Sequence, residues 1–261
     1  MKRILIVGNW KMNLDTHEAS ILIKKLNDNI QIHRDIEVVV APSMLTIQPL
    51  SREIDRRKFV LAAQNAYFKD QGAYTGEVSF NMLRGLVDYC IVGHSERRIY
   101  LHETFEDVRD KVTAAIRNNI YPILCIGETH QEKVEGESKR VIHDQLTTAL
   151  SNLTAADVEK VVVVYEPVWA ISTFSGTPAK PSDIKPMVDL IRYNIKELYG
   201  EKASENVRVL YGGSVDDQNA RAYLEIDGVD GLLPGSASLN YVKFSKIVDS
   251  AYSLIHQKRK E

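Results

Sequence analysis

The sequence lacks the features that mark secreted, membrane-spanning and nucleic-acid-binding proteins. Its two cysteines, Cys90 and Cys125, are too few for a disulfide framework. No apolar run approaches the ~18 residues that a membrane span needs, and polar residues interrupt the apolar N-terminal run too early for a signal peptide. The formal net charge of -2 argues against nucleic acid as a partner. We therefore expect a cytoplasmic protein that binds neither nucleic acid nor a membrane.

Several motifs of common chemistries are also absent. The sequence contains no Gly-x-x-x-x-Gly-Lys loop, no Gly-x-Gly-x-x-Gly after an apolar run, no His-Glu-x-x-His, no Cys-x-x-Cys and no Gly-x-Ser-x-Gly. Nucleotide, metal and serine-hydrolase chemistry are therefore not predicted. We expect no metal and no cofactor.

Eight short apolar runs, rich in Val and Ile, divide the chain. They are continuous rather than alternating, as in strands that are buried on both faces. Segments between them, such as residues 105–116 and 187–198, show helical periodicity. The eight runs are Ile4 to Val7, Ile36 to Ala41, Phe59 to Ala63, Tyr89 to Val92, Tyr121 to Ile126, Val161 to Tyr165, Val207 to Tyr211 and Val229 to Leu233.

Helix punctuation agrees with this division. Asp15 and Ser182 are expected as N-caps, and Gly200 as the residue that ends a helix after Tyr199. Strand and helix alternate to the end of 261 residues with no change in composition, and a barrel of this kind is typically ~250 residues. The sequence predicts an α/β protein, a single (β/α)8 barrel of eight parallel strands spanning residues 1–261. Counting alone does not exclude an open doubly wound sheet.

Polar or glycine-containing clusters follow most of the predicted strands. In a barrel these clusters meet at the C-terminal rim, where such folds place their active sites. They are Asn9 to Lys11, Gln64 and Asn65, Gly93 to Arg97, Glu166, Gly212 to Ser214, and Gly235 with Ser236.

Three of these residues carry side chains suited to acid–base chemistry at a carbonyl group. Glu166 is a candidate base, because burial should raise the pKa of its carboxyl toward neutrality. His94 begins a predicted helix, whose dipole disfavours imidazolium, so we expect a neutral ring that donates a hydrogen bond to a carbonyl oxygen. Lys11 can stabilise negative charge on oxygen. Taken singly, each has an ordinary alternative: an ion-paired carboxylate, a structural histidine and a surface lysine.

Two glycine-containing turns suggest an anion site. Tyr211 to Val215 and Pro234 to Ser238 follow the last two predicted strands, where amide N–H groups often bind phosphate in barrels. One such turn alone is more often only a tight turn. Together with the base, imidazole and ammonium, they predict proton abstraction next to a carbonyl, through an enediolate, in a small phosphorylated sugar.

Along nearly its whole length the chain resembles the triosephosphate isomerase family. The matching segments, in the family's order, are Gly8 to Asn13, Ala63 to Asn65, Gly72 to Glu77, Val92 to Arg98, Leu124 to Thr129, Tyr165 to Ile171 and Tyr211 to Val215.

The resemblance implies roles for individual residues. Glu166 would be the base, His94 the electrophile and proton shuttle, and Asn9 and Lys11 would lie at the substrate oxygens with Glu96 near the lysine. A homodimer is implied as well: Gly72 to Glu77 matches a loop that enters the neighbouring subunit, with Thr75 near the partner's site and Arg98 in the supporting network.

The chain departs from the family at the predicted phosphate grip, made of Ser172, Ser214, Gly235 and Ser236. Where the family usually reads Ala-Ile-Gly-Thr-Gly-Lys, this chain has Ala-Ile-Ser-Thr-Phe-Ser, in a closing loop (lid) about three residues longer. The family's Leu-Val-Gly-Gly-Ala-Ser becomes Leu-Pro-Gly-Ser-Ala-Ser at residues 233–238. Ser172 and Ser236 keep their amide N–H, whereas Pro234 has none.

Three functions are therefore open. The first is interconversion of dihydroxyacetone phosphate and glyceraldehyde 3-phosphate. The second is the same enediolate chemistry on a tetrulose phosphate such as L-erythrulose 1-phosphate, in a pocket altered at Ser172 and Ser236. The third is a barrel that binds a phosphorylated metabolite without converting it. The intact Lys11, His94 and Glu166 count against this third function.

Overall fold

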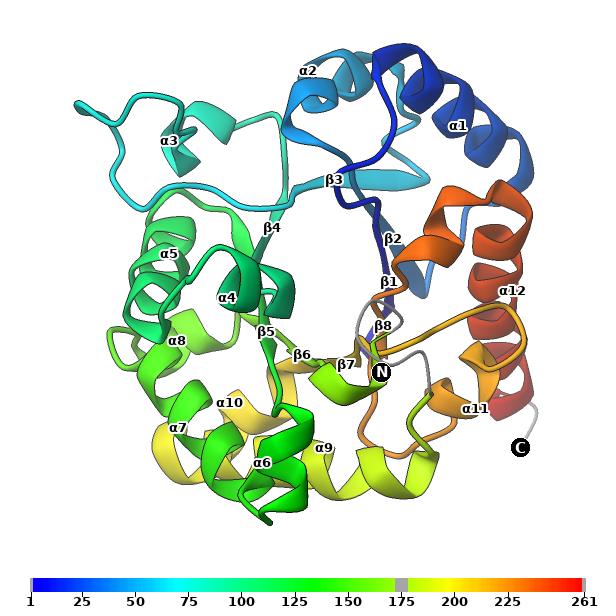
Figure 1. Cartoon of the computed structure of the whole chain (residues 1–261). Coiled ribbons are helices and arrows are strands. Elements are labelled where there is room, and N and C mark those ends of the chain that lie inside the picture. Colours follow the sequence, from blue (N-terminus) through cyan, green and yellow to red (C-terminus); the bar gives the residue numbers. More distant parts are fainter. Residues whose placement is uncertain (1, 172–177, 260–261) are drawn as a thin grey trace.

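Eight parallel strands form a closed barrel in a computed structural model that describes residues 2–171 and 178–259 (Figure 1). The strands follow one another in sequence order, and β1 pairs with β8 through Leu5 with Gly231 and Ile6 with Leu232. This closure confirms the (β/α)8 barrel and excludes the open sheet. The strands are β1 Ile4–Asn9, β2 Ile36–Ala41, β3 Phe59–Ala63, β4 Tyr89–Val92, β5 Tyr121–Ile126, β6 Val162–Tyr165, β7 Arg208–Tyr211 and β8 Gly231–Leu232.

The predicted strands differ from the observed ones mainly at the two ends of the barrel seam. β1 continues two residues past the apolar run, because Gly8 and Asn9 pair with Val40 and Ala41. β8 is only two residues long, and at Gly231 a Cβ atom would lie 1.9 Å from the carbonyl oxygen of Leu5. Asn9 is therefore held in the sheet, which fixes where its side chain enters the rim.

Helices surround the barrel (Figure 1). They are α1 Thr16–Asn29, α2 Met44–Glu53, α3 Phe80–Leu83, α4 Ser95–Tyr100, α5 Phe105–Arg117, α6 His130–Val134, α7 Ser138–Leu150, α8 Ala155–Val158, α9 Pro181–Tyr199, α10 Glu201–Asn206, α11 Ala220–Leu224 and α12 Tyr241–Lys258, with 3-10 turns η1 Val168–Ala170 and η2 Ser236–Leu239. None of the helices in the described ranges is long and apolar enough to cross a membrane.

Two of the three predicted helix boundaries are confirmed. Asp15 caps α1 in a capping box with Glu18, and Gly200, at φ +92°, ends α9. The prediction that Ser182 is an N-cap was wrong. α9 begins one residue earlier, at Pro181, because a proline is well suited to the first helical position.

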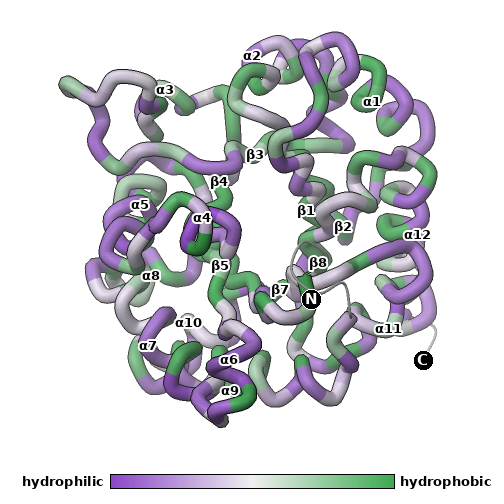
Figure 2. Tube along the Cα trace, viewed as in Figure 1, coloured by the Kyte–Doolittle hydropathy of each residue, from purple (hydrophilic) through white to green (hydrophobic). Residues whose placement is uncertain are grey.

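The strands are buried on both faces, as the continuous apolar runs predicted. Side chains such as Leu5, Val39, Ile91, Ile123 and Val164 fill the barrel interior, while the alternate residues pack under the helices. In Figure 2 the strands are largely hydrophobic and the outer helices carry much of the hydrophilic sequence. Because the interior is filled, the space for a ligand lies at the rim.

Candidate active site

Residues that follow five of the strands line one cavity of about 210 Å³ at the C-terminal rim. Lys11 comes from the loop after β1, His94 follows β4 and Glu166 follows β6. The turns after β7 and β8 supply the remaining predicted wall. The fold thus brings together groups that lie far apart in the sequence.

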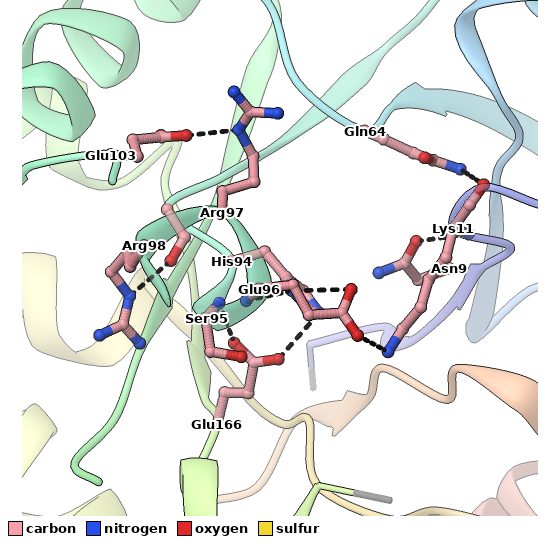
Figure 3. Close-up of polar contacts among 11 residues, drawn as sticks. Asn9, Lys11, Gln64, His94, Ser95, Glu96, Arg97, Arg98, Glu103 and Glu166 are labelled. Atoms are coloured by element: carbon pink, nitrogen blue, oxygen red, sulfur yellow. Dashed lines mark hydrogen bonds and ion pairs between the residues drawn. The ribbon is translucent and has the colours of Figure 1, made fainter. Parts of the chain in front are cut away.

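Glu166 lies at the end of β6 with only 1% of its surface exposed. Its Oε2 accepts a hydrogen bond of 3.0 Å from the Ser95 amide, and its Oε1 lies 2.8 Å from His94 Nε2 (Figure 3). Within the described residues Oε1 accepts no hydrogen bond of good geometry, so its contact with His94 is close but poorly aligned. Glu166 is therefore held against the start of α4.

The expectation of a raised Glu166 pKa was wrong. Burial raises the pKa of the carboxyl, but the neighbouring His94, the Ser95 amide and the charge of Arg98 together lower it by more. The pKa therefore lies below its ordinary value. The carboxylate is accordingly present in its basic, ionised form.

Gly127 allows the backbone of β5 to approach that of Glu166. A Cβ atom on Gly127 would lie 1.9 Å from the carbonyl oxygen of Glu166. The amide of Gln145 clamps the glycine, accepting from its N–H at 2.8 Å and donating to its oxygen at 3.2 Å. The position of Glu166 thus depends on a glycine at position 127.

His94 is the N-cap of α4, as the sequence predicted. Its Nδ1 accepts a hydrogen bond of 3.3 Å from the amide of Glu96, which places the single ring proton of the neutral imidazole on Nε2. That N–H group faces Glu166. The ring is therefore arranged to donate from Nε2, as the expected chemistry requires.

Lys11 has a strained backbone and a fixed ammonium group. Its φ is +54°, in the left-handed region that non-glycine residues seldom adopt. Its N–H donates to Asn9 Oδ1 at 3.1 Å, and its carbonyl accepts from Gln64 Nε2 at 2.7 Å. The ammonium lies 2.5 Å from Glu96 Oε1 (Figure 3). The structure thus brings Asn9, Lys11 and Glu96 together, and Gln64 is a site residue whose role sequence reasoning missed.

The predicted phosphate grip is partly formed. Within the described residues, the N–H groups of Gly213, Gly235 and Ser236 have no hydrogen-bond acceptor. In contrast, the N–H and Oγ of Ser214 both donate to the carbonyl of Ala170, at 3.1 and 2.8 Å. The prediction for Ser172 lies outside the described residues, as does the rest of the segment 172–177.

Comparison with known proteins gives a single answer. A family model described as triosephosphate isomerase matches residues 4–251. The chain belongs to the triosephosphate isomerase family. It is 40% identical over 250 residues to a triosephosphate isomerase of Clostridium tetani, covering 95% of this chain and 97% of the relative. It is 41% identical to those of Caldanaerobacter subterraneus, over 252 residues (95% and 100%), and Chloroherpeton thalassium, over 256 residues (96% and 100%).

In this member of the triosephosphate isomerase family, a buried carboxylate ties down the start of the predicted lid. Glu128, 2% exposed, accepts from Trp169 Nε1 at 2.9 Å and from the hydroxyl of Tyr165 at 3.0 Å. The ammonium of Lys133 lies 3.3 Å from the centroid of the Trp169 ring. Glu128 lies in a segment that matched the family, but no pattern in the sequence showed which side chains it meets.

The two residues predicted for the dimer lie apart. Thr75 is exposed in the long loop between β3 and α3, which projects from the barrel in Figure 1. Arg98 lies on α4 and donates to the carbonyl of Gly93 at 3.0 Å, and to that of Gly127 at 3.4 Å. Arg98 therefore joins the ends of β4 and β5.

Proposed function

We propose that this chain interconverts dihydroxyacetone phosphate and glyceraldehyde 3-phosphate. Glu166 takes a proton from the carbon next to the carbonyl, and His94 donates a hydrogen bond from Nε2 to the carbonyl oxygen. Lys11 and Asn9 stabilise the charge on the enediolate oxygens, and Glu96 orients the lysine. Glu166 then returns the proton to the neighbouring carbon, while His94 carries the hydroxyl proton from one oxygen to the other, so that the former hydroxyl oxygen becomes the new carbonyl and ketose and aldose are exchanged. Within the described residues the amides of Gly235 and Ser236 have no acceptor, which supports binding of the phosphate there, and Ser172 and Ser214 stay predictions from the sequence.

The observation that carries this proposal is the convergence of three groups on one cavity. Lys11, His94 and Glu166 line the same space of about 210 Å³, and the tautomer of His94 and the ionised state of Glu166 suit a donor and a base. Membership of the family makes the two triose phosphates the first substrates to test.

The test is exchange of carbon-bound hydrogen with solvent, followed for dihydroxyacetone phosphate in deuterated water. We expect deuterium in the product and loss of exchange in Glu166→Gln, which keeps the size of the side chain and removes the base. A folded wild-type protein that neither exchanges nor converts any sugar phosphate would contradict catalysis and leave a barrel that only binds such metabolites.

A tetrulose phosphate such as L-erythrulose 1-phosphate is the second candidate substrate. The altered turn after β8 lies next to Asn9 and Lys11, the residues predicted to bind the substrate oxygens. The backbone N–H of Asn9 donates to the Pro234 carbonyl at 3.0 Å, and a Cβ on Gly235 would lie 3.4 Å from Lys11 Cε. Measurement of kcat/KM on three- and four-carbon ketose and aldose phosphates decides between them. A value for glyceraldehyde 3-phosphate that is several decades higher than for any tetrulose phosphate excludes the second candidate.

We also propose that residues 1–261 act as one domain that forms a homodimer. A second cavity of about 800 Å³ shares Lys11 and His94 with the first and is lined by Met12 and Met44. Met12 is 95% exposed and Met82 is 61% exposed, which is unusual for large apolar side chains and is typical of a surface that a partner covers. We propose that the projecting loop with Thr75 enters this cavity in a second copy.

Light scattering coupled to size exclusion tests the homodimer. We expect twice the chain mass for the wild type and the monomer mass for Thr75→Arg, with reduced activity. A monomeric wild type with full activity would contradict the proposal. A cytoplasmic location stays a prediction from the sequence.

A further inference from the structure

Asp216 puts a negative charge in the wall of the cavity that is proposed to bind phosphate. It lines the 210 Å³ cavity beside Gly213, Gly235 and Ser236, whose amides have no acceptor within the described residues. Lys11 is the only cation among the described residues of this wall, and its ammonium already lies against Glu96. A carboxylate here opposes the binding of an anion, so its presence needs a reason.

The hydrogen bonds of Asp216 supply one reason. Its Oδ1 accepts from the amides of Gln218 and Asn219, at 2.9 and 3.0 Å. In return, Asn219 Oδ1 accepts from the Asp216 amide at 2.9 Å, and Asn219 Nδ2 donates to the Ser214 carbonyl at 3.1 Å. This reciprocal clamp fixes the turn that carries Gly213 and Ser214.

The clamp itself does not need a charge. The acceptor atom is one side-chain oxygen, and Asn offers an oxygen at the same place as Asp does. The carboxylate therefore combines two separable effects: its hydrogen bonds shape the turn, and its charge repels the ligand.

The repulsion depends on the charge of the ligand. Coulomb energy is proportional to the product of the charges, so a phosphate dianion is repelled about twice as strongly as a monoanion. Phosphate monoesters change between these two forms near pH ~6. The effect of the Asp216 charge on affinity should therefore grow with pH.

From this geometry we infer that Asp216 is a positioning and specificity-determining residue: its clamp orders the anion-binding turn, and its charge lowers affinity for phosphate dianions. The inference rests on the proposed function only in taking the ligand to be a phosphate. It predicts that a single isosteric substitution separates the two effects.

Binding of inorganic phosphate, measured by calorimetry on the full chain at pH 8 and pH 5.5, provides the test. At pH 8, Asp216→Asn should bind phosphate about 3- to 10-fold more tightly than the wild type. At pH 5.5 its gain in affinity should be about the square root of the gain at pH 8. KM for the sugar phosphate should fall with it. Asp216→Ala removes charge and clamp together, so it should bind more weakly than Asp216→Asn.

Asp217→Asn is the matched control. It removes the same charge one residue away, from a side chain that is not among the described residues of the cavity wall and that lies 3.4 Å from Lys246. Its phosphate affinity should stay within about 2-fold of the wild type, because a paired, more distant charge acts weakly.

Two results would overturn the charge argument: no gain in affinity for Asp216→Asn at pH 8, or an equal gain at both pH values. Equal affinities of Asp216→Ala and Asp216→Asn would overturn the clamp. If the wild type converts triose phosphate while these results fail, only this inference falls. If neither the wild type nor any variant binds phosphate or converts a sugar phosphate, both this inference and the proposed function are refuted.

Discussion

Gln64 is expected to hold Lys11, the proposed catalytic lysine, in its strained conformation. Its Nε2 donates to the carbonyls of Lys11 and Ala41, at 2.7 and 2.9 Å. Lys11 has φ +54°, and the left-handed region costs a non-glycine residue about 1–2 kcal/mol. Replacement by Met in Gln64→Met keeps the length of the side chain and removes both hydrogen bonds. Fewer hydrogen bonds then hold Lys11 in its strained conformation.

The structure sets the size of the effect. Two lost hydrogen bonds at about 0.5–1.5 kcal/mol each lower the free energy of unfolding by about 1–3 kcal/mol. The bond to the Lys11 carbonyl alone, about 0.5–1.5 kcal/mol, is comparable to the strain at Lys11, so the Lys11 backbone should relax toward negative φ. Relaxation shifts the ammonium, and a misplacement of about 1 Å can cost about 10²-fold in rate. We expect kcat/KM to fall by about 10- to 100-fold.

Steady-state kinetics in both directions and urea unfolding measure the two effects. Asn118→Leu is the control, because Asn118 Nδ2 also donates two hydrogen bonds, to Asp70 Oδ1 at 3.0 Å and to the Ala114 carbonyl at 2.9 Å, away from the cavity. It should lose stability and keep kcat/KM. If Gln64→Met loses stability to the same extent but keeps its full kcat/KM, the lysine does not need the clamp and the reasoning is refuted.

Three further predictions concern the surroundings of Glu166. Gly127→Ala should lower the free energy of unfolding by about 1–3 kcal/mol and reduce kcat, because its Cβ would lie 1.9 Å from the Glu166 carbonyl oxygen; unchanged urea midpoint and kcat would contradict this. The folded pKa of Glu166 is lowered, so the contribution of its carboxylate to stability is present above the unfolded pKa of 4.5 and is lost as pH falls through the folded value. The free energy of unfolding of Glu166→Gln, measured in urea, should therefore depend less on pH below about 5 than that of the wild type. An equal or steeper dependence would contradict this prediction. Trp169→Phe removes a donor to the buried Glu128 and should lower the free energy of unfolding by about 1.5–3 kcal/mol, as should Tyr165→Phe, which removes the other side-chain donor; no loss in either variant would show that the carboxylate is not held this way.

The fold could be predicted from the sequence because its signals are local and repeated. Each strand is a continuous apolar run, and the helix ends at Asp15 and Gly200 carry residues whose backbone or side chain suits a cap. The miss at Ser182 has the same origin: a serine and a preceding proline both signal a helix start, and Pro181 occupied the first turn itself.

The site could be predicted only as far as residue types reveal it. Glu166, His94 and Lys11 carry reactive groups at strand ends, and the barrel brings them together. Gln64 bonds to a backbone carbonyl of another loop, and Asp216 bonds to amides of its own turn; no periodicity in the sequence shows either contact. The direction of the Glu166 pKa shift was missed for a related reason, since burial follows from the sequence but the aim of the Ser95 amide does not.

The segment His94 to Glu96, where α4 begins, explains why these groups depend on one another. It supplies the imidazole, the Ser95 amide that holds Glu166, and the carboxylate that holds Lys11 (Figure 3). Glu166 and Lys11 are thus both bound to one turn of chain. Any change that shifts the start of α4 therefore acts on all three groups at once.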